Sequence, residues 1–344
     1  MSLEESPKSF AQGFSSLLYN IKSIMEQQNF SVKPADPKGP WDVIIIGSGP
    51  AGLTSAIYTT RGAASTLILG GEVWGGQLML TTTVDNFPGF PDGIEGPELM
   101  AKMKAQAERF GAEFVGANVT SIKVDKKPFE VVAGGVTYLT RSIIITTGAQ
   151  TTWLDVPGVR ELIGRGISSC APCDAPFFRN KKVAVVGGGD SAMEEASVLT
   201  KYASEVTIIH RRDAFRASVA MQEKIKGNPK IKIIWNTEVI KVNGESKLES
   251  LDLINKLTNQ PSQLAVDGLF VAIGHKPMSD AFAGVIDRDD KGYIDQANWH
   301  CGTNIKGIFA AGDVMDKHFK QAVVASGMGC IAAMEALKYL EDVK

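Results

Sequence analysis

The stretch VIIIGSGPAG at residues 43–52 decides the fold of this chain. Four β-branched residues in a row are typical of a strand that is buried on both faces. The glycines that follow have the spacing G-x-G-x-x-G, and residues 53–60 have the composition of a helix. A strand, such a loop and a helix in this order predict a binding site for the pyrophosphate of a dinucleotide.

Each glycine of this loop has its own expected role. Gly47 permits the tight turn, Gly49 lets a pyrophosphate approach the backbone, and Gly52 lets the helix pack closely on the strand. The helix N-terminus adds free N–H groups and the positive end of its dipole. The next predicted strand, residues 66–69, ends in two glycines, where an acidic residue usually binds a ribose hydroxyl, and Glu72 lies past that point.

A second loop of the same kind follows the β-branched run at residues 183–186. The sequence GGGDSA at 187–192 opens a predicted helix, with alanine in the third glycine position, which the pattern permits. The strand after that helix, residues 206–209, ends in HRRD at 210–213, and Arg216 follows. Basic residues at this position suit a ribose 2′-phosphate, so the second loop predicts NADPH.

The sequence CAPCD at residues 170–174 lies between the two loops. Two cysteines at this spacing can close and reopen a small disulfide, and Asp174 is placed where it can move the proton that the exchange needs. The spacing also makes half of a zinc site, but the chain has one such pair and its four histidines show no metal spacing, so we expect no metal. A dithiol beside two dinucleotide sites indicates a flavoprotein fed by a nicotinamide, because a flavin accepts a hydride and passes two electrons to a disulfide.

The composition argues against several other classes of protein. The chain has 344 residues, enough for two domains, and 44% of them are hydrophobic and 22% charged, as in soluble globular proteins. A net charge of -2 gives no broad electrostatic reason to bind nucleic acid or an anionic membrane. No apolar run approaches the ~18 residues of a membrane span. Two of the four cysteines form the C-x-x-C pair, which suits a reducing compartment and predicts a cytoplasmic location.

Two further segments have a predicted structure. Residues 1–40 form an N-terminal extension whose apolar residues recur at helical spacing, which predicts one amphipathic helix that packs on this protein or a neighbouring subunit, with disorder as the alternative. These apolar residues are Phe10, Phe14, Leu17, Ile21 and Met25. Residues 123–138 alternate loosely between apolar and polar, which predicts a small antiparallel insert.

From about Trp41 to the C-terminus the chain resembles the low-molecular-weight thioredoxin reductases, which are NADPH-dependent and contain FAD. Beyond the two loops and the dithiol, the resemblance rests on several short motifs. They are GGQL (75–78), NFPG (86–89), TGA (147–149), GRG (164–166), HRRDAFRAS (210–218), AIGH (272–275) and GDVMDKHFKQA (312–322). The most specific feature is a C-x-x-C-D inside the NADPH domain, since lipoamide and glutathione reductases carry their redox cysteines in the FAD domain.

The resemblance implies an α/β fold with two Rossmann-like three-layer (ββα/βα) nucleotide-binding domains. The FAD domain would comprise residues 41–153 and 284–344, and the NADPH domain, residues 154–283, would be inserted into it and carry the dithiol. The crossings near residues 147–157 and 274–280 would act as a hinge, so that the dithiol faces the flavin in one state and thioredoxin in another. A homodimer is also implied.

The resemblance further implies a set of site residues. The FAD site would include Gly47, Ser48, Gly49, Pro50, Ala51, Gly52, Gln77, Leu78, Asn86, Thr147, Gly148, Gly312, Asp313, Lys320, Gln321 and Ala322. The NADPH site would include Gly187, Gly188, Gly189, Asp190, Ser191, Glu194, His210, Arg211, Arg212 and Arg216. Cys173 would be the thiol nearer the flavin, Cys170 would attack the protein substrate, and Asp174 would be the general acid. Lys320 stands where the family often has arginine, and Pro172 stiffens the dithiol.

The implied function is thioredoxin-disulfide reduction. A hydride passes from NADPH to FAD, the electrons reduce the Cys170–Cys173 disulfide, and the dithiol then reduces thioredoxin by thiol–disulfide exchange. One alternative is a related flavin-dependent dithiol oxidase or a peroxiredoxin-reducing flavoprotein, and the arginine cluster argues against an oxidase that uses no nicotinamide. A second alternative is a non-catalytic nucleotide-binding redox sensor, which would not need an acid after its dithiol.

Overall fold

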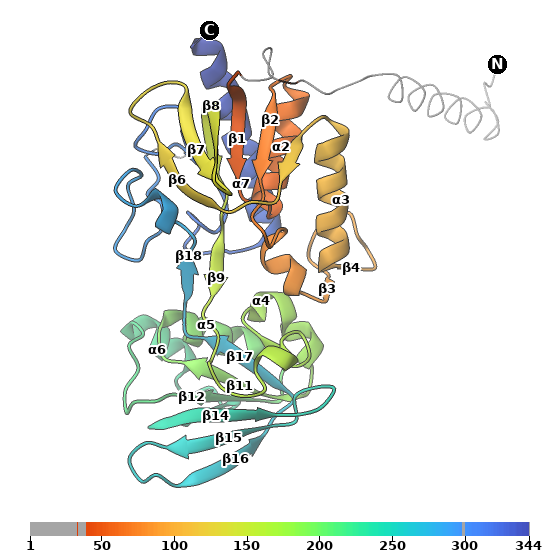
Figure 1. The fold of residues 1–344 in the computed structure, drawn as a ribbon. Helices are drawn as coiled ribbons and strands as arrows, with labels where there is room; N and C mark the ends of the chain where they lie inside the picture. The colour runs from red at the N-terminus through yellow and green to blue at the C-terminus, as the bar shows by residue number, and fades with distance from the viewer. Residues whose placement is uncertain (1–32, 34–38, 298–299, 344) are drawn as a thin grey trace, which may run out of the picture.

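The computed structural model describes residues 33, 39–297 and 300–343, and these form two lobes (Figure 1). Each lobe is built on a sheet of mainly parallel strands with helices packed against it. The predicted N-terminal amphipathic helix, residues 10–25, lies outside the described residues. The glycine-rich loops and the dithiol all lie within them.

In the described part of the chain, the first lobe has a seven-stranded sheet of order β5-β2-β1-β8-β7-β6, in which β19 also pairs with β8. Its strands are β1 (Trp41–Ile46), β2 (Thr66–Leu69), β5 (Glu113–Val115), β6 (Val119–Lys123), β7 (Phe129–Ala133), β8 (Val136–Ile145) and β19 (Ile308–Ala310). The pairs β1–β2, β1–β8, β2–β5 and β8–β19 are parallel, whereas β6, β7 and β8 pair antiparallel. The predicted antiparallel insert is therefore confirmed.

Strand β1 shows why this sheet is covered on both faces. Val43 and Ile45 pack in the cluster formed with helices α2 (Pro50–Arg61), α3 (Gly96–Arg109) and α7 (Ala322–Asp342). Ile44 and Ile46 point the other way, into the cluster that includes side chains of β6 and β7. All four residues are at most 2% exposed, as the β-branched run predicted.

The second lobe repeats this arrangement. Within residues 39–297 it has a five-stranded parallel sheet of order β10-β17-β11-β12-β13 and a three-stranded antiparallel sheet of order β14-β15-β16. The strands are β10 (Ile167–Ser168), β11 (Lys182–Gly187), β12 (Glu205–Ile209), β13 (Ile231–Ile234), β14 (Thr237–Asn243), β15 (Ser250–Asn255), β16 (Pro261–Ala265) and β17 (Gly268–Ala272). Val183 and Val185 face the cluster that contains helix α5 (Asp190–Leu199), and Ala184 faces the cluster that contains β14 and β15.

Short elements complete the two lobes. The helices are α4 (Ala171–Asp174) and α6 (Val219–Ile225), and the 3-10 turns are η1 (Gly76–Leu80), η2 (Arg160–Leu162), η3 (Ala175–Phe178) and η4 (Asp280–Phe282). A hairpin of β3 (Thr83–Val84) and β4 (Ile94–Glu95) precedes α3.

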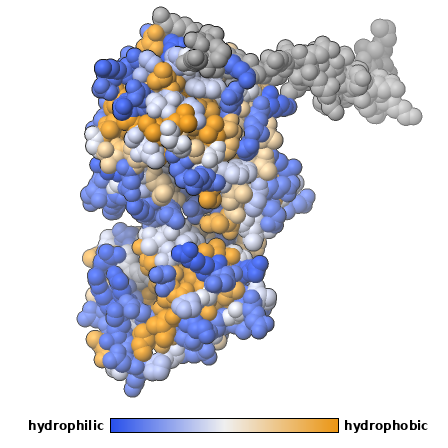
Figure 2. All heavy atoms as spheres, viewed as in Figure 1, coloured by the Kyte–Doolittle hydropathy of each residue, from blue (hydrophilic) through white to orange (hydrophobic). Residues whose placement is uncertain are grey.

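Two strands carry the chain between the lobes. It leaves the first lobe through β9 (Ala149–Thr151) and returns through β18 (His275–Pro277), and these strands pair antiparallel (Figure 1). Met278 N also donates to Gly148 O at 2.9 Å, so the two crossings are tied together. In the space-filling view a furrow separates the lobes on one face (Figure 2). The predicted crossings are thus a narrow two-stranded connection.

Helix α7 is the one helix of the described residues that is long and apolar enough to cross a membrane by length and composition. In this fold it packs as a core helix, because Ala332, Ala333 and Ala336 are fully buried in the cluster shared with α2. Its opposite face carries exposed apolar side chains.

Candidate active site

Cys170 and Cys173 form a disulfide with a Cα–Cα distance of 5.3 Å. Helix α4 begins directly after Cys170, whose carbonyl oxygen accepts from the N–H groups of Cys173 at 3.2 Å and Asp174 at 3.0 Å. Pro172 fits in this first turn because an N–H there would have no helical partner. The sequence CAPCD therefore folds into one short helical turn that presents both sulfurs.

Ser168 links Asp174 to the backbone of the dithiol. The Ser168 hydroxyl accepts from Cys170 N at 3.0 Å and also hydrogen-bonds the Asp174 carboxyl. Burial raises the pKa of Asp174 above its ordinary value, and the hydrogen bond to Ser168 opposes this in part. A raised pKa suits a group that must give and take a proton beside a sulfur.

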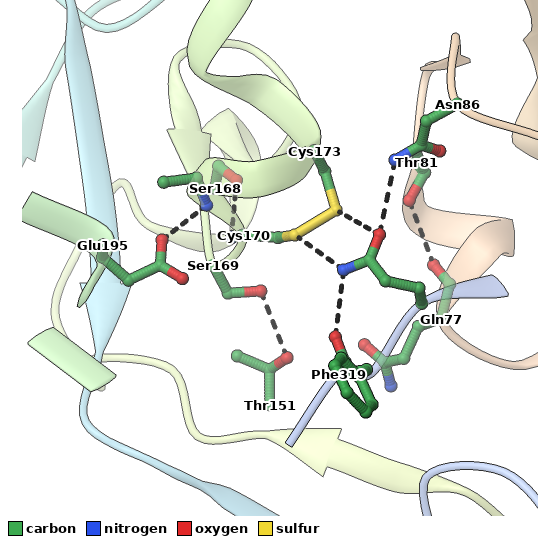
Figure 3. The surroundings of a disulfide bond; sticks show 12 residues. Gln77, Thr81, Asn86, Thr151, Ser168, Ser169, Cys170, Cys173, Glu195 and Phe319 are labelled. Carbon is green, nitrogen blue, oxygen red and sulfur yellow. Dashed lines mark hydrogen bonds between the residues drawn. A yellow bond between two sulfur atoms is a disulfide. The ribbon is translucent and has the colours of Figure 1, made fainter. Parts of the chain in front are cut away.

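Glu195 is a carboxylate of the site that the sequence did not single out. It lies on α5, and its Oε2 accepts from Ala171 N at the start of α4 (Figure 3). Burial raises the pKa of Glu195 to about 7, the charges of Asp174 and Glu194 add to this, and the Ala171 hydrogen bond opposes it. The only sequence signal was an acidic residue in the helix after the second loop, and packing of α5 against α4 brings it to the dithiol.

The disulfide faces the first lobe, where it meets the side chain of Gln321. In Figure 3 this side chain is the unlabelled amide that dashed lines connect to the two labelled cysteines, to Asn86 and to Phe319. Gln321 Nε2 lies 3.8 Å from Cys170 Sγ, and Gln321 Oε1 lies 3.7 Å from Cys173 Sγ. Asn86 Nδ2 donates to the same Oε1 at 3.4 Å. Asn86 and Gln321, both predicted for the FAD site, are therefore brought together at the sulfurs.

A tight turn before α7 positions Gln321. The carboxylate of Asp316 accepts from three successive backbone N–H groups, those of His318, Phe319 and Lys320, at 2.8 to 3.0 Å. Lys320 has a φ of 48°, in the left-handed region that reverses the chain into α7. Asp316 is thus a supporting residue that the sequence did not identify as one.

Charged groups gather around this turn. Burial raises the pKa of Asp313 to about 6, with a further contribution from the charge of Asp316. Burial lowers the pKa of Lys320, and both aspartates oppose that effect. His275 on β18 also lies in the field of Lys320, and burial together with this charge lowers its pKa to about 4.

The first glycine-rich loop has the shape that a pyrophosphate requires. A Cβ on Gly47, which has a φ of 115°, would lie 2.3 Å from Thr146 O, and one on Gly52 would lie 2.2 Å from Gly47 O. A Cβ on Gly49 would meet no atom of the described residues within 4 Å. Two glycines are therefore needed for packing, and the third faces open space at the start of α2, where a phosphate can approach. Ser48 anchors the loop by donating to Gly70 O at 2.7 Å.

The other residues predicted for the FAD site lie on loops that follow parallel strands or on the turns beside them. Thr147 and Gly148 follow β8, Gly312 and Asp313 follow β19, Pro50 and Ala51 open α2, Gln77 and Leu78 lie on η1, and Lys320 and Ala322 flank Gln321. A Cβ on Gly312 would lie 3.0 Å from that of Ala51, so the loop after β19 packs on the start of α2. Ligands of such sheets bind at the carboxyl ends of the strands, and the predicted set gathers there.

The second glycine-rich loop repeats the pattern of the first. A Cβ on Gly187 would lie 2.4 Å from Ala272 O, whereas one on Gly189 would meet no described atom within 4 Å. The segment after β12 folds back onto this loop, because Gly188 O accepts from the N–H groups of Arg216 at 2.7 Å and Ala217 at 3.1 Å. Asp190 Oδ1 also accepts from Ser218 N at 2.6 Å. The two segments therefore form one platform at the start of α5.

The basic residues differ in their surroundings. Arg211, Arg212 and Arg216 are exposed beside the loop, as are Ser191 and Glu194, and none of the three arginines pairs with a carboxylate in the described part of the chain. His210 is only 6% exposed; its ring lies beneath Gly188, and its Nε2 is 3.0 Å from Ala214 O. The three arginines are therefore exposed to solvent, whereas His210 supports the loop from beneath, and the contacts of all four residues with NADPH stay predictions.

The chain matches the pyridine nucleotide-disulphide oxidoreductase family over residues 41–329. A thioredoxin reductase from Streptomyces clavuligerus is 50% identical over 302 residues, which cover 87% of this chain and 94% of that protein. The structure of thioredoxin reductase from Giardia duodenalis aligns with a TM-score of 0.84 at 40% identity, and that of Lactococcus lactis thioredoxin reductase in the FR conformation aligns with a TM-score of 0.60 at the same identity. Both alignments cover 88% of this chain and 99% of the other. The chain therefore belongs to the pyridine nucleotide-disulphide oxidoreductase family, within the group of the thioredoxin reductases.

Proposed function

We propose that this chain is an NADPH-dependent thioredoxin reductase that holds FAD in the first lobe and NADPH in the second. The observation that carries the proposal is the Cys170–Cys173 disulfide, which is held on the second lobe with its sulfurs against the Gln321 turn of the first. A dinucleotide-type loop on each lobe and a disulfide at their junction match a path for two electrons from a nicotinamide to a protein disulfide.

The two cofactors fit the residues that the structure provides. Gly49 and the start of α2 would bind the pyrophosphate of FAD, and Gly189 and the start of α5 that of NADPH. Arg211, Arg212 and Arg216 would bind the 2′-phosphate that distinguishes NADPH from NADH. When bound, FAD accepts a hydride from NADPH and passes two electrons to the disulfide.

The reduced dithiol would then react by thiol–disulfide exchange. The Cys170 thiolate attacks one sulfur of the thioredoxin disulfide, so that a mixed disulfide forms and a thioredoxin thiolate leaves. Cys173 loses its proton and attacks Cys170 Sγ, which closes the enzyme disulfide and releases the second thioredoxin sulfur. Two electrons pass to thioredoxin in all, and Asp174, whose pKa is raised by burial, would give the leaving sulfur a proton.

The lobes would have to change their orientation in each cycle. Both sulfurs contact Gln321 of the first lobe and are half-buried, so a protein disulfide needs them turned outward. The Giardia and Lactococcus enzymes are equally identical to this chain and equally covered, yet their TM-scores are 0.84 and 0.60. A difference of this size at equal identity is what two orientations of the same lobes produce, and β9 and β18 would be the hinge.

A steady-state assay tests the function. The purified protein is supplied with FAD, NADPH, thioredoxin and a chromogenic disulfide, and we expect a rate that requires every component. A rate that consumes oxygen without thioredoxin would indicate the dithiol oxidase, and bound nucleotides without turnover would indicate the redox sensor. Crystal structures of the oxidised enzyme and of the reduced enzyme with NADP would test the motion, since the same lobe orientation in both would refute it.

A homodimer in the cytoplasm is part of the proposal. Helix α7 carries Val323, Ile331 and Met334 on its exposed face, and Tyr58 of α2 is also exposed; each is more than 40% accessible. An apolar helical face of this kind is typical of a subunit interface. Analytical ultracentrifugation is expected to give twice the chain mass for the wild type and the mass of a single chain for Met334→Lys.

The proposed cytoplasmic location rests on the cysteines, because a single redox pair among four cysteines fits a reducing compartment.

A further inference from the structure

We propose that the Gln321 carboxamide makes the two sulfurs of the dithiol chemically unequal, by favouring a thiolate on Cys170 and a thiol on Cys173. The inference rests on the proposed reductase function and names a positioning residue for it. Gln321 belongs to the first lobe and the sulfurs to the second, and Gln321 lies 151 positions after Cys170 in the sequence. It acts in the lobe arrangement that this structure shows.

Neighbouring groups fix which way round the amide lies. Gln321 Nε2 is 3.0 Å from the carbonyl oxygen of Phe319, which can only accept, so that atom must be the nitrogen (Figure 3). The other end of the amide then accepts from Asn86 Nδ2 at 3.4 Å, as an oxygen must. Exchanging the oxygen and nitrogen of Gln321 would set two acceptors face to face at Phe319. The orientation follows from these contacts without reference to the sulfurs.

This orientation presents a different atom to each sulfur. The N–H donor of Nε2 lies 3.8 Å from Cys170 Sγ, and the acceptor Oε1 lies 3.7 Å from Cys173 Sγ. A donor stabilises a thiolate, and an acceptor stabilises a thiol that donates its S–H. When the S–S bond is reduced, the two electrons and one proton are therefore best placed as a thiolate on Cys170 and an S–H on Cys173. The thiolate is the nucleophile of the exchange, so a distribution that is set before the lobes turn leaves Cys170 ready to attack the thioredoxin disulfide.

In the described residues, no charged group near the dithiol presents a donor to one sulfur and an acceptor to the other, as the Gln321 amide does. The carboxylates of Asp174 on α4 and Glu195 on α5 lie at the dithiol turn and disfavour a thiolate there when charged. The Lys320 ammonium donates to Lys317 O and contacts neither sulfur in the described residues. His275 on β18 and Asp313 and Asp316 beyond β19 lie around Lys320. Among the polar contacts found in the described residues, the Gln321 amide is the one that touches both sulfurs through opposite ends.

Pulsed alkylation of the reduced holoenzyme tests the proposal. The enzyme is reduced with dithiothreitol without oxygen and pulsed with iodoacetamide at a series of pH values, and each cysteine is quantified by fragmentation of the peptide that contains residues 166–179. The pH dependence gives an apparent pKa for each thiol, which does not depend on its accessibility. Cys301 is an internal reference for an unreactive thiol, because burial raises its pKa to about 11.

We expect Cys170 to be labelled at lower pH than Cys173 in the wild type. In Gln321→Met, which keeps the length but has neither donor nor acceptor, labelling of Cys170 near neutral pH should fall about threefold to tenfold. Gln321→Glu should lower it further, because a carboxylate replaces the donor. Ser169→Ala is the matched control: it removes a hydroxyl beside Cys170 that bonds Thr151 Oγ1 at 3.3 Å, and it should leave the ratio of the two cysteines unchanged.

Equal pH profiles for the two cysteines in the wild type would overturn the proposal, as would an unchanged ratio in both Gln321 variants. The wild-type comparison decides even if a variant fails to fold. A wild type that reduces thioredoxin with NADPH but shows no asymmetry refutes only the role of Gln321. A wild type that does not reduce thioredoxin refutes the reductase function instead.

Discussion

Replacing Glu195 by glutamine should make the protein more stable at high pH and not at low pH. The wild-type carboxylate is half-buried on α5 and accepts from Ala171 N. Folding raises its pKa from 4.5 to about 7, mainly through burial, so the native state binds this proton more tightly than the unfolded state does. The resulting stabilisation is fully present below about pH 4.5 and is lost as the pH rises through 7.

The magnitude follows from the two pKa values. A change from 4.5 to about 7 corresponds to at most about 3 kcal/mol, which the wild type loses between low and high pH. Glutamine keeps a carbonyl oxygen that can accept from Ala171 N and carries no charge at any pH. We therefore expect Glu195→Gln to unfold at nearly the same urea concentration as the wild type at about pH 4, and to be more stable by up to about 3 kcal/mol at about pH 8.

Equilibrium unfolding of the holoenzyme in urea at the two pH values measures this difference. Glu223→Gln is the control, because Glu223 is an exposed partner of Lys226 in the same lobe and its loss should cost less than about 1 kcal/mol at either pH. A Glu195→Gln variant that gains equal stability at both pH values, or gains more at low pH, would refute the reasoning.

Three further predictions concern the electron path and the two cofactors. Cys170→Ser or Cys173→Ser should abolish thioredoxin reduction and leave bleaching of the flavin by NADPH intact in stopped-flow absorbance; loss of bleaching would point to a different route. Arg216→Ala should raise the KM for NADPH about tenfold and leave the KM for NADH nearly unchanged, since the 2′-phosphate is the only difference between the two nucleotides. An equal rise in both KM values would contradict the assignment of Arg216 to the 2′-phosphate. Gly52→Ala places a Cβ 2.2 Å from a backbone oxygen and should give misfolded or FAD-poor protein. Gly49→Ala should fold and only bind FAD more weakly, because its Cβ would meet no described atom within 4 Å. The ratio of flavin absorbance to protein absorbance in the purified variants measures the bound FAD.

Local sequence determined the elements of this fold and the two loops. The run at residues 43–46 is buried on both faces because four β-branched residues leave no polar side for solvent, and the structure confirms it. Gly47 and Gly52 were identified from the G-x-G-x-x-G spacing, and the structure shows why that spacing matters: Gly47 has a φ of 115°, and a Cβ on Gly52 would lie 2.2 Å from Gly47 O. The contact of Gly47 with Thr146, in contrast, comes from the packing of the sheet. The spacing of Cys170 and Cys173 likewise allowed a disulfide, and one is present.

Only the tertiary structure decided which groups meet the sulfurs. Gln321 and Glu195 reach the dithiol because the lobes and the helices α4 and α5 pack in one particular way, and no periodicity in the sequence encodes such contacts. His210 seemed equivalent to the arginines beside it, yet its ring is buried beneath the second loop. Backbone preferences act over a few residues, whereas burial, hydrogen bonding and the pKa values that depend on them are set by atoms far apart in the chain.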